Sequence, residues 1–266
     1  MSGGFPRILQ DWRHGQPAMA FVAEQLAEST SPLVVIGERV LNAEFPAATQ
    51  ARAVLSAVGA GETMFSNIER RTGLNEGSLS RTLGILTRDL RVVAAERPMS
   101  GAASRLTHYL VDDPYLRFWL RFVAPRMELI LRGRGEPASD EITRSWPEYR
   151  GRAVEPLVRR SIERLLPHDR LGAARHVGSY WTRTGDIEVD LVGSPDRESP
   201  ADVAFVGSVK WRDRAAFDRG DLLHLAAQRA AVPGAGDVPL VAVARTRVTA
   251  DADLALTAAD LLAAWP

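Results

Sequence analysis

The amino-acid sequence predicts an α+β chain with a mainly helical first half and an α/β domain in its second half. Apolar residues recur every three or four positions through most of the first 130 residues, the period of amphipathic helices. From about residue 180, short alternating or continuous apolar runs indicate strands instead. A chain of 266 residues is long enough for two separate cores.

The composition excludes several classes of function. The chain has no cysteine, so disulfides, thiolate zinc sites and a cysteine nucleophile are excluded, and a reducing compartment is favoured. Its 33 basic and 33 acidic residues balance, so any nucleic-acid contact must come from a local patch. The opening residues lack a signal-peptide pattern, and no apolar stretch reaches the roughly 20 residues of a membrane span. We expect a cytoplasmic protein with no membrane contact.

Residues 1–46 are predicted to be a helical lead-in. Apolar residues at 19, 21, 22 and 26 and the run 33–36 follow helical spacing. Because these few apolar side chains cannot form a core large enough to fold alone, we expect this segment to dock on the next domain or on a partner.

Residues 47–112 have the order of a winged helix-turn-helix. Helices are predicted at 47–58, 66–73 and 75–90, followed by strands at 91–98 and 107–113. Ser66 and Glu69 form a capping box for the second helix, and Asn75 or Ser78 caps the third. The residues joining the strands form a flexible wing.

The third helix has a leucine face and a polar, basic face. The opposite sides of this amphipathic pattern predict a buried core and a surface that can reach phosphates and base edges. The DNA-contacting candidates of this domain are Arg70, Arg71, Ser80, Arg81 and Arg88. The same scaffold also serves as a protein-interaction module, so both interpretations stay open.

Residues 113–146 are predicted to contain an aromatic helix and a linker. Tyr115, Phe118, Trp119 and Phe122 recur at helical spacing, which favours a buried helix, with a base-stacking platform as the alternative. The glycine-containing and charged stretch 131–146 is interpreted as the linker.

Residues 147–266 are predicted to form the α/β domain. A helix at 151–166, with Leu157 inward and Arg159 outward, precedes strands at 187–191 and 203–209, a helix at 219–231, a strand at 238–245 and a helix at 251–265. This α-β-β-α-β order is the core of the restriction-endonuclease-like fold.

A metal-dependent nuclease site is the chemical hypothesis for this domain. Asp190 and Lys210 fall on two adjacent strands that a hairpin could bring together, and Glu155 on the preceding helix could add a carboxylate. Asp190 and Glu155 are the candidate ligands of Mg²⁺, and Lys210 would steady the attacking water or the transition state. Ser208 stands where such sites carry an acidic residue. A cross-strand Asp190–Lys210 ion pair and a phosphate-contacting remnant without metal are the alternatives.

Several segments resemble a known family. DDPYLRFWLRFVAP, EVDLVG and GSVKW, with the preceding winged-helix pattern, resemble the C-terminal region of archaeal-type P-loop ATPases that carry domain of unknown function 234. The opening GGFPRILQDW resembles the end of the ATPase lid. The resemblance implies a winged helix and a PD-(D/E)XK-like domain without the ATPase core, and a site at Asp190, Lys210 and Glu155 from which Ser208 departs.

Three functions follow as hypotheses. The first is a DNA-associated accessory or regulatory module, with a degenerate nuclease fold, that binds double-stranded DNA and works with a P-loop ATPase in cis or in trans. The second is an active Mg²⁺-dependent DNA endonuclease. The third is a protein-interaction regulatory domain that does not bind DNA. No ATPase activity is expected, because the chain contains no GxxxxGK[ST] loop.

Overall fold

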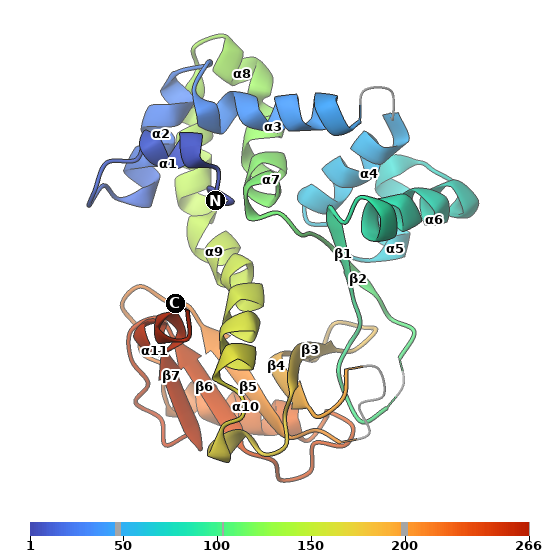
Figure 1. The fold of residues 1–266 in the computed structure, drawn as a ribbon, viewed down its shortest axis with the longest axis vertical. Coiled ribbons are helices and arrows are strands. Elements are labelled where there is room, and N and C mark those ends of the chain that lie inside the picture. The colour runs from blue at the N-terminus through green and yellow to red at the C-terminus, as the bar shows by residue number, and fades with distance from the viewer. Residues whose placement is uncertain (46–48, 103, 198–201, 266) are drawn as a thin grey trace. The chain divides into compact units, whose positions relative to one another are not determined.

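The computed structural model describes residues 1–45, 49–102, 104–197 and 202–265 of a mixed helical and β structure (Figure 1). The chain divides into two compact units. The first unit comprises residues 1–96 and 107–146, and the second comprises 97–106 and 147–266. The predicted boundary at 46/47 lies outside the described residues. Within the described ranges, no helix combines the length and the apolar character that crossing a membrane requires.

The lead-in of the first unit is helical, as predicted. It forms α1 (Pro6–Gln10), α2 (Ala18–Ala27) and α3 (Pro32–Glu44). Helix α3 packs on the aromatic segment, where the Tyr115 hydroxyl donates to the Leu33 carbonyl at 3.1 Å and Trp119 Nε1 donates to the Val34 carbonyl at 2.8 Å. Gly37 permits this packing, because a Cβ there would lie about 2.2 Å from the Trp119 ring.

The predicted order of three helices and a hairpin follows. The helices are α4 (Thr49–Gly59), α5 (Phe65–Thr72) and α6 (Glu76–Gly84), and a π-helical turn, Ile85–Asp89, extends α6. Strands β1 (Val93–Glu96) and β2 (His108–Val111) pair antiparallel. Asn75 is the cap of α6, since its side chain accepts from the Ser78 amide. The Ser66–Glu69 capping box is wrong, because α5 begins one residue earlier and its N-cap residue, Met64, makes no side-chain cap.

The aromatic segment is a buried helix. It consists of α7 (Pro114–Phe118) and a π-helical turn, Trp119–Val123, and is followed by α8 (Met127–Leu131). Its four large aromatic side chains, Tyr115, Phe118, Trp119 and Phe122, are all buried. The base-stacking alternative is therefore wrong, because a stacking ring must be exposed to the base.

The expected linker at 131–146 is largely helical, and that prediction is wrong. Helix α9 runs from Gly135 to Leu165 and continues into the second unit. Pro137 lies in the first turn, where a helix tolerates proline because no backbone hydrogen bond is lost. Ala138 and Ile142, four residues apart, are buried and hold this part of the helix in the first unit.

The residues expected to form a free wing belong to the second unit. The Met99 amide donates to the Ser179 carbonyl at 2.8 Å, and the Gly101 amide donates to the Pro233 carbonyl at 2.6 Å. The Met99 side chain is buried in an apolar cluster with Val192 and Val206. These contacts hold residues 99 and 101 in the second unit, in place of the free wing expected there, while residue 103 lies outside the described residues.

The second unit is built on a five-stranded mixed sheet in the order β3-β4-β5-β6-β7. The strands are β3 (His176–Trp181), β4 (Glu188–Ser194), β5 (Phe205–Lys210), β6 (Leu240–Ala244) and β7 (Leu254–Thr257). Both β3-β4 and β4-β5 are antiparallel, whereas β5-β6 and β6-β7 are parallel. The β4-β5 pairing confirms that the two predicted strands are neighbours.

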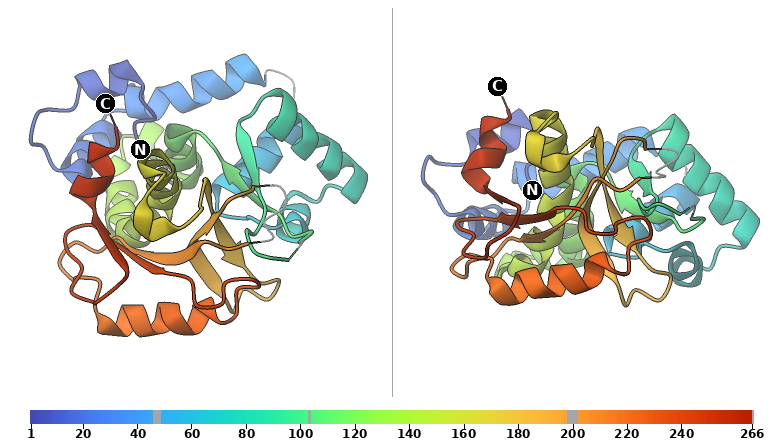
Figure 2. Two further views of the ribbon diagram at one scale, coloured as in Figure 1. Left: turned by 60° about the horizontal axis from the view of Figure 1, so that its bottom comes forward. Right: turned by 90° about the horizontal axis from the view of Figure 1, so that it is seen from below.

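Helices cover both faces of this sheet. Figure 2 shows α10 (Arg219–Arg229) on one side and the end of α9 with α11 (Ala258–Ala263) on the other. Val158 and Ile162 of α9 pack with Leu191 on one face, and Leu225 of α10 packs with Val206 on the opposite face. Leu157 is exposed and Arg159 is buried, so both predicted orientations on α9 are wrong.

Two elements of the sheet differ from the prediction. Strand β3 was not predicted, and residues 254–257 form β7 although they lie within the predicted last helix, 251–265. Leu254 and Leu256 are buried while Ala255 is exposed, which is the two-residue period of a strand. The neighbouring alanines favour a helix and hide this short pattern in the sequence.

Candidate functional site

A β-bulge in β4 positions Asp190. Gly178 pairs with Val192 and Tyr180 pairs with Val189, so two steps along β3 match three steps along β4. Val189 and Val192 consequently both pack on the α10 side, and Leu191 packs on the α9 side. A bulge of this kind redirects the side chain of an inserted residue, and it brings Asp190 toward α9.

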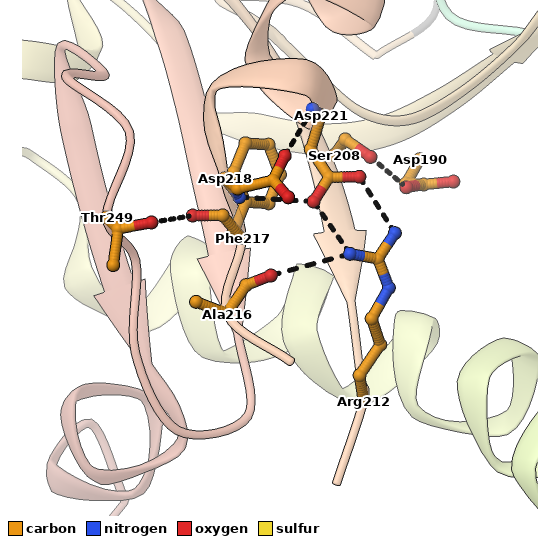
Figure 3. A network of polar contacts seen from close by, with 8 residues as sticks. All are labelled: Asp190, Ser208, Arg212, Ala216, Phe217, Asp218, Asp221 and Thr249. Carbon is orange, nitrogen blue, oxygen red and sulfur yellow. Dashed lines mark hydrogen bonds and ion pairs between the residues drawn. The ribbon is translucent and has the colours of Figure 1, made fainter. Parts of the chain in front are cut away.

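The carboxylate of Asp190 is fixed by β5. Leu191 lies opposite Gly207, so the antiparallel register puts Asp190 beside Ser208. Asp190 Oδ2 accepts from the Ser208 hydroxyl at 2.9 Å and from the Val209 amide at 2.7 Å. Figure 3 shows the contact between Ser208 and Asp190. The serine that replaces an acid in the sequence pattern thus donates to the remaining acid.

Glu155 of α9 faces the same carboxylate. Burial raises the pKa of Glu155 from 4.5 to about 8, and the negative charge of Asp190 adds to the rise, while Arg159 opposes it. Arg159 is buried, donates to the Asp190 carbonyl at 3.3 Å, and lies 3.9 Å from Glu155 Oε2. The structure therefore brings Glu155, Asp190 and Ser208 together around a buried cation.

Within the described ranges, Lys210 forms no bond to the carboxylates of this site, and its charge acts on Asp221 of α10. Among the described residues it forms no ion pair with Asp190, so the alternative of a cross-strand ion pair is wrong. Burial alone would raise the pKa of Asp221, but hydrogen bonds from Arg212 and the Asp218 backbone, with the charges of Arg212 and Lys210, hold that pKa below its ordinary value. The positive charge of Lys210 thus helps to lower the pKa of Asp221 in the first turn of α10.

The donor set does not fit a resident Mg²⁺. Such an ion requires near-octahedral oxygen ligands, usually carboxylates and water. Here one oxygen of Asp190 already accepts two hydrogen bonds, Ser208 supplies only a hydroxyl, and the guanidinium of Arg159 lies beside Glu155. Throughout the part of the chain that the structure describes, no group of three or more histidine and acidic side chains is arranged to hold a metal.

The predicted DNA-contacting residues lie on α5 and α6 of the first unit. All five candidates are exposed, and Arg81 and Arg88 lie on the side of their helix away from the buried Leu79, Leu83 and Leu86. Arg70 donates to Asn67 and Arg71 pairs with Glu62 at 3.3 Å. No ion pair or hydrogen bond within the described ranges uses the side chains of Ser80, Arg81 or Arg88.

Two features of the site were missed in the sequence. Arg159 follows Glu155 by four residues, the spacing of an ion pair on one helix face. Asp218 and Asp221 form a capping box at the start of α10, and Arg212 donates to both oxygens of Asp221 at 2.8 Å (Figure 3). The three-residue spacing of these aspartates was a readable helix-start signal.

Comparisons with known proteins give one match. The model of the family DUF234, described as archaea bacterial proteins of unknown function, matches residues 119–221. This stretch contains Glu155, Asp190, Ser208 and Lys210, and it supports the resemblance to that domain of unknown function. Neither the curated proteins nor the solved structures contain a match to the chain.

Proposed function

We propose that this chain, with its DUF234 segment, is a DNA-associated accessory or regulatory module with a winged helix and a degenerate PD-(D/E)XK-like domain. Its partner would be a P-loop ATPase acting in cis or in trans. The observation that carries DNA association is the exposed face of Ser80, Arg81 and Arg88 on a helix whose opposite face is buried.

The arrangement around α6 supports a winged helix. Between α4 and α5, Met64 bridges antiparallel to His108 of β2, and the Tyr109 amide donates to the Thr63 carbonyl at 2.8 Å. Three helices, a short paired segment and a hairpin are the parts of this scaffold. Because residues 97–106 are bonded into the second unit, DNA contact in the first unit would depend on α6 rather than on a free wing.

The chemistry near Asp190 supports a binding role over cleavage. A hydroxyl replaces one carboxylate, and a buried arginine supplies positive charge where a nuclease would require a divalent cation. An accessory role requires binding without cleavage, which is compatible with a site in which one acidic position of the nuclease pattern is a serine.

Duplex binding at several salt concentrations tests the proposal. We expect the double variant Arg81→Ala/Arg88→Ala to weaken binding about equally for different sequences and to reduce the salt dependence, because phosphate contacts release counterions. The matched control is Arg7→Ala/Arg132→Ala, which removes two exposed arginines elsewhere in the same unit. Binding that is unchanged in the first variant would contradict the proposal.

A plasmid assay distinguishes the accessory module from the second candidate function, an Mg²⁺-dependent endonuclease. The closeness of Glu155 and Asp190 favours this second candidate. We expect no nicking of supercoiled DNA with Mg²⁺ or Mn²⁺. Nicking that disappears in Asp190→Ala would assign the endonuclease instead, whereas nicking that persists in that variant identifies a contaminant.

A further inference from the structure

Two loops in the second unit carry a concentration of positive charge in a chain that is neutral as a whole. We call residues 210–219 and 245–247 the basic edge; they contain six basic and two acidic residues, against 33 of each in the whole chain. The basic residues are Lys210, Arg212, Arg214, Arg219, Arg245 and Arg247.

The basic edge lies where two parallel strands end. Lys210 at the end of β5 pairs in register with Ala244 at the end of β6, so the two loops leave the sheet side by side. Phe217 and Val248 then form a further parallel bridge between them. The carboxyl ends of parallel strands are the usual ligand-binding edge of an open α/β sheet.

The backbone of the basic edge is held in place. Phe217 is fully buried with Ala242 and Ala244, its amide donates to the Arg247 carbonyl at 3.1 Å, and its carbonyl accepts from the Thr249 amide at 2.9 Å. The Thr249 hydroxyl also donates to the Phe217 carbonyl, at 3.3 Å (Figure 3). Arginines on an anchored loop lose less conformational entropy on binding than arginines on a free loop. This segment is therefore preorganised.

The acidic groups of the region are already engaged. Asp213 pairs with Arg150 at 2.8 Å and with Arg245, and Asp221 takes both bonds from Arg212. Asp218 caps α10 by accepting from the Asp221 amide.

Three arginines of the basic edge are left for a ligand. Arg214, Arg219 and Arg247 are exposed, and none of them forms an ion pair with another described residue. The edge therefore presents positive charge that internal carboxylates do not neutralise.

We propose that the basic edge binds the backbone phosphates of nucleic acid. Arginine presents a planar fork that matches phosphate oxygens. A membrane surface fits less well, because the large apolar side chains of these loops, Trp211 and Phe217, pack inward rather than toward solvent. Lys210, at the start of the basic edge, follows Ser208, the partner of Asp190, by two residues in the same strand. The inference deepens the proposed DNA association and rests on it.

Anisotropy measurements with a labelled duplex and its labelled single strand test this proposal in the full chain. We expect Arg214→Ala/Arg247→Ala to weaken binding roughly tenfold at about 100 mM salt. The slope of log affinity against log salt should fall by about 1.8, the value for two lost phosphate contacts. Arg170→Ala/Arg175→Ala is the control, since it removes two exposed arginines near the start of β3, at the opposite edge of the sheet.

Each outcome separates this proposal from the proposed function. A loss in the basic-edge variant with the control and Arg81→Ala/Arg88→Ala unchanged would support the basic edge and overturn contact by α6. A loss of binding in Arg81→Ala/Arg88→Ala, with the basic-edge variant unchanged, would overturn the basic-edge proposal and leave the proposed function standing. Equal losses of affinity in the basic-edge variant and the control would mean that only net charge matters, which would overturn the basic-edge proposal. Failure of the wild-type protein to bind either oligonucleotide would also overturn it. If the wild type does not bind DNA but sediments with phosphatidylserine vesicles, and the Arg214→Ala/Arg247→Ala variant does not sediment with them, the basic edge is a lipid-binding surface instead.

Discussion

Glu155 is the residue whose environment differs most from that of a free side chain at the candidate site. Its pKa in the folded protein is raised from 4.5 to about 8 by burial and by Asp190. Between pH 4.5 and about 8, Glu155 is therefore protonated in the folded state and ionised in the unfolded state. Stability from this group is complete below pH 4.5 and is lost as the pH rises through about 8.

Replacing Glu155 with glutamine should remove that loss. We expect Glu155→Gln to be more stable than the wild type at pH 9 by about 2–5 kcal/mol, or roughly 5–15 °C in Tm, and to be close to it at pH 5. Calorimetry at the two pH values measures the difference. Glu148→Gln, at an exposed position on the same helix, should show no such pH dependence, and a similar gain there would contradict the assignment.

Ser208 shows how a residue can be identified in a sequence without its role being known. The spacing before Lys210 marks it as the position that departs from an acidic pattern. Its contact with Asp190 depends on the β4-β5 register and on the bulge, neither of which a single strand specifies. Arg159 is similar, because its burial depends on the turn of α9 that faces the sheet.

At the scale of elements, α3 and the aromatic segment pack so closely that one methyl group should matter. A Cβ on Gly37 would meet the Trp119 ring, whereas one on Gly77 of α6 has nothing nearer than Asn75 Oδ1 at 3.7 Å. The ring is itself held by its bond to Val34, so it cannot move freely to relieve the overlap.

Alanine at these two glycines should have opposite effects on stability. We expect Gly37→Ala to destabilise the protein by about 1–3 kcal/mol through overpacking. Gly77→Ala should stabilise it by about 0.5–1 kcal/mol, because alanine loses less conformational freedom in a helix. Urea unfolding measures both, and equal effects would mean that α3 does not pack on Trp119 as described.

At the scale of the whole molecule, chain order and spatial order disagree at residues 97–106. These residues lie between β1 and β2 of the first unit, yet they belong to the second. Met99 fills an apolar cluster between β4, β5 and α10, so part of the second unit's core comes from a distant part of the sequence.

Truncating Met99 should therefore loosen the second unit selectively. We expect Met99→Ala to cost about 2–4 kcal/mol, the usual effect of removing a buried methionine side chain. Hydrogen exchange should accelerate at the amides of β4 and β5 and stay unchanged in α3 and α7. Leu131→Ala, at an exposed position, is the control, and a Met99→Ala variant that behaves like it would contradict the packing.

The sequence by itself determined the features that depend on local pattern. The leucines of α6, the aromatic spacing of α7 and the apolar runs of β4, β5 and β6 were all readable, because helix and strand periods are properties of short segments. The residue types also limited the chemistry, since the chain has no cysteine and a serine precedes Lys210 by two positions.

Only the tertiary structure decided how these parts combine. The bulge that turns Asp190, the burial of Arg159 and the docking of Met99 all join residues far apart in the chain. In each case the free energy comes from burial or charge pairing that exists only after distant segments meet. A periodic pattern can indicate which face is apolar, but it cannot specify what covers that face.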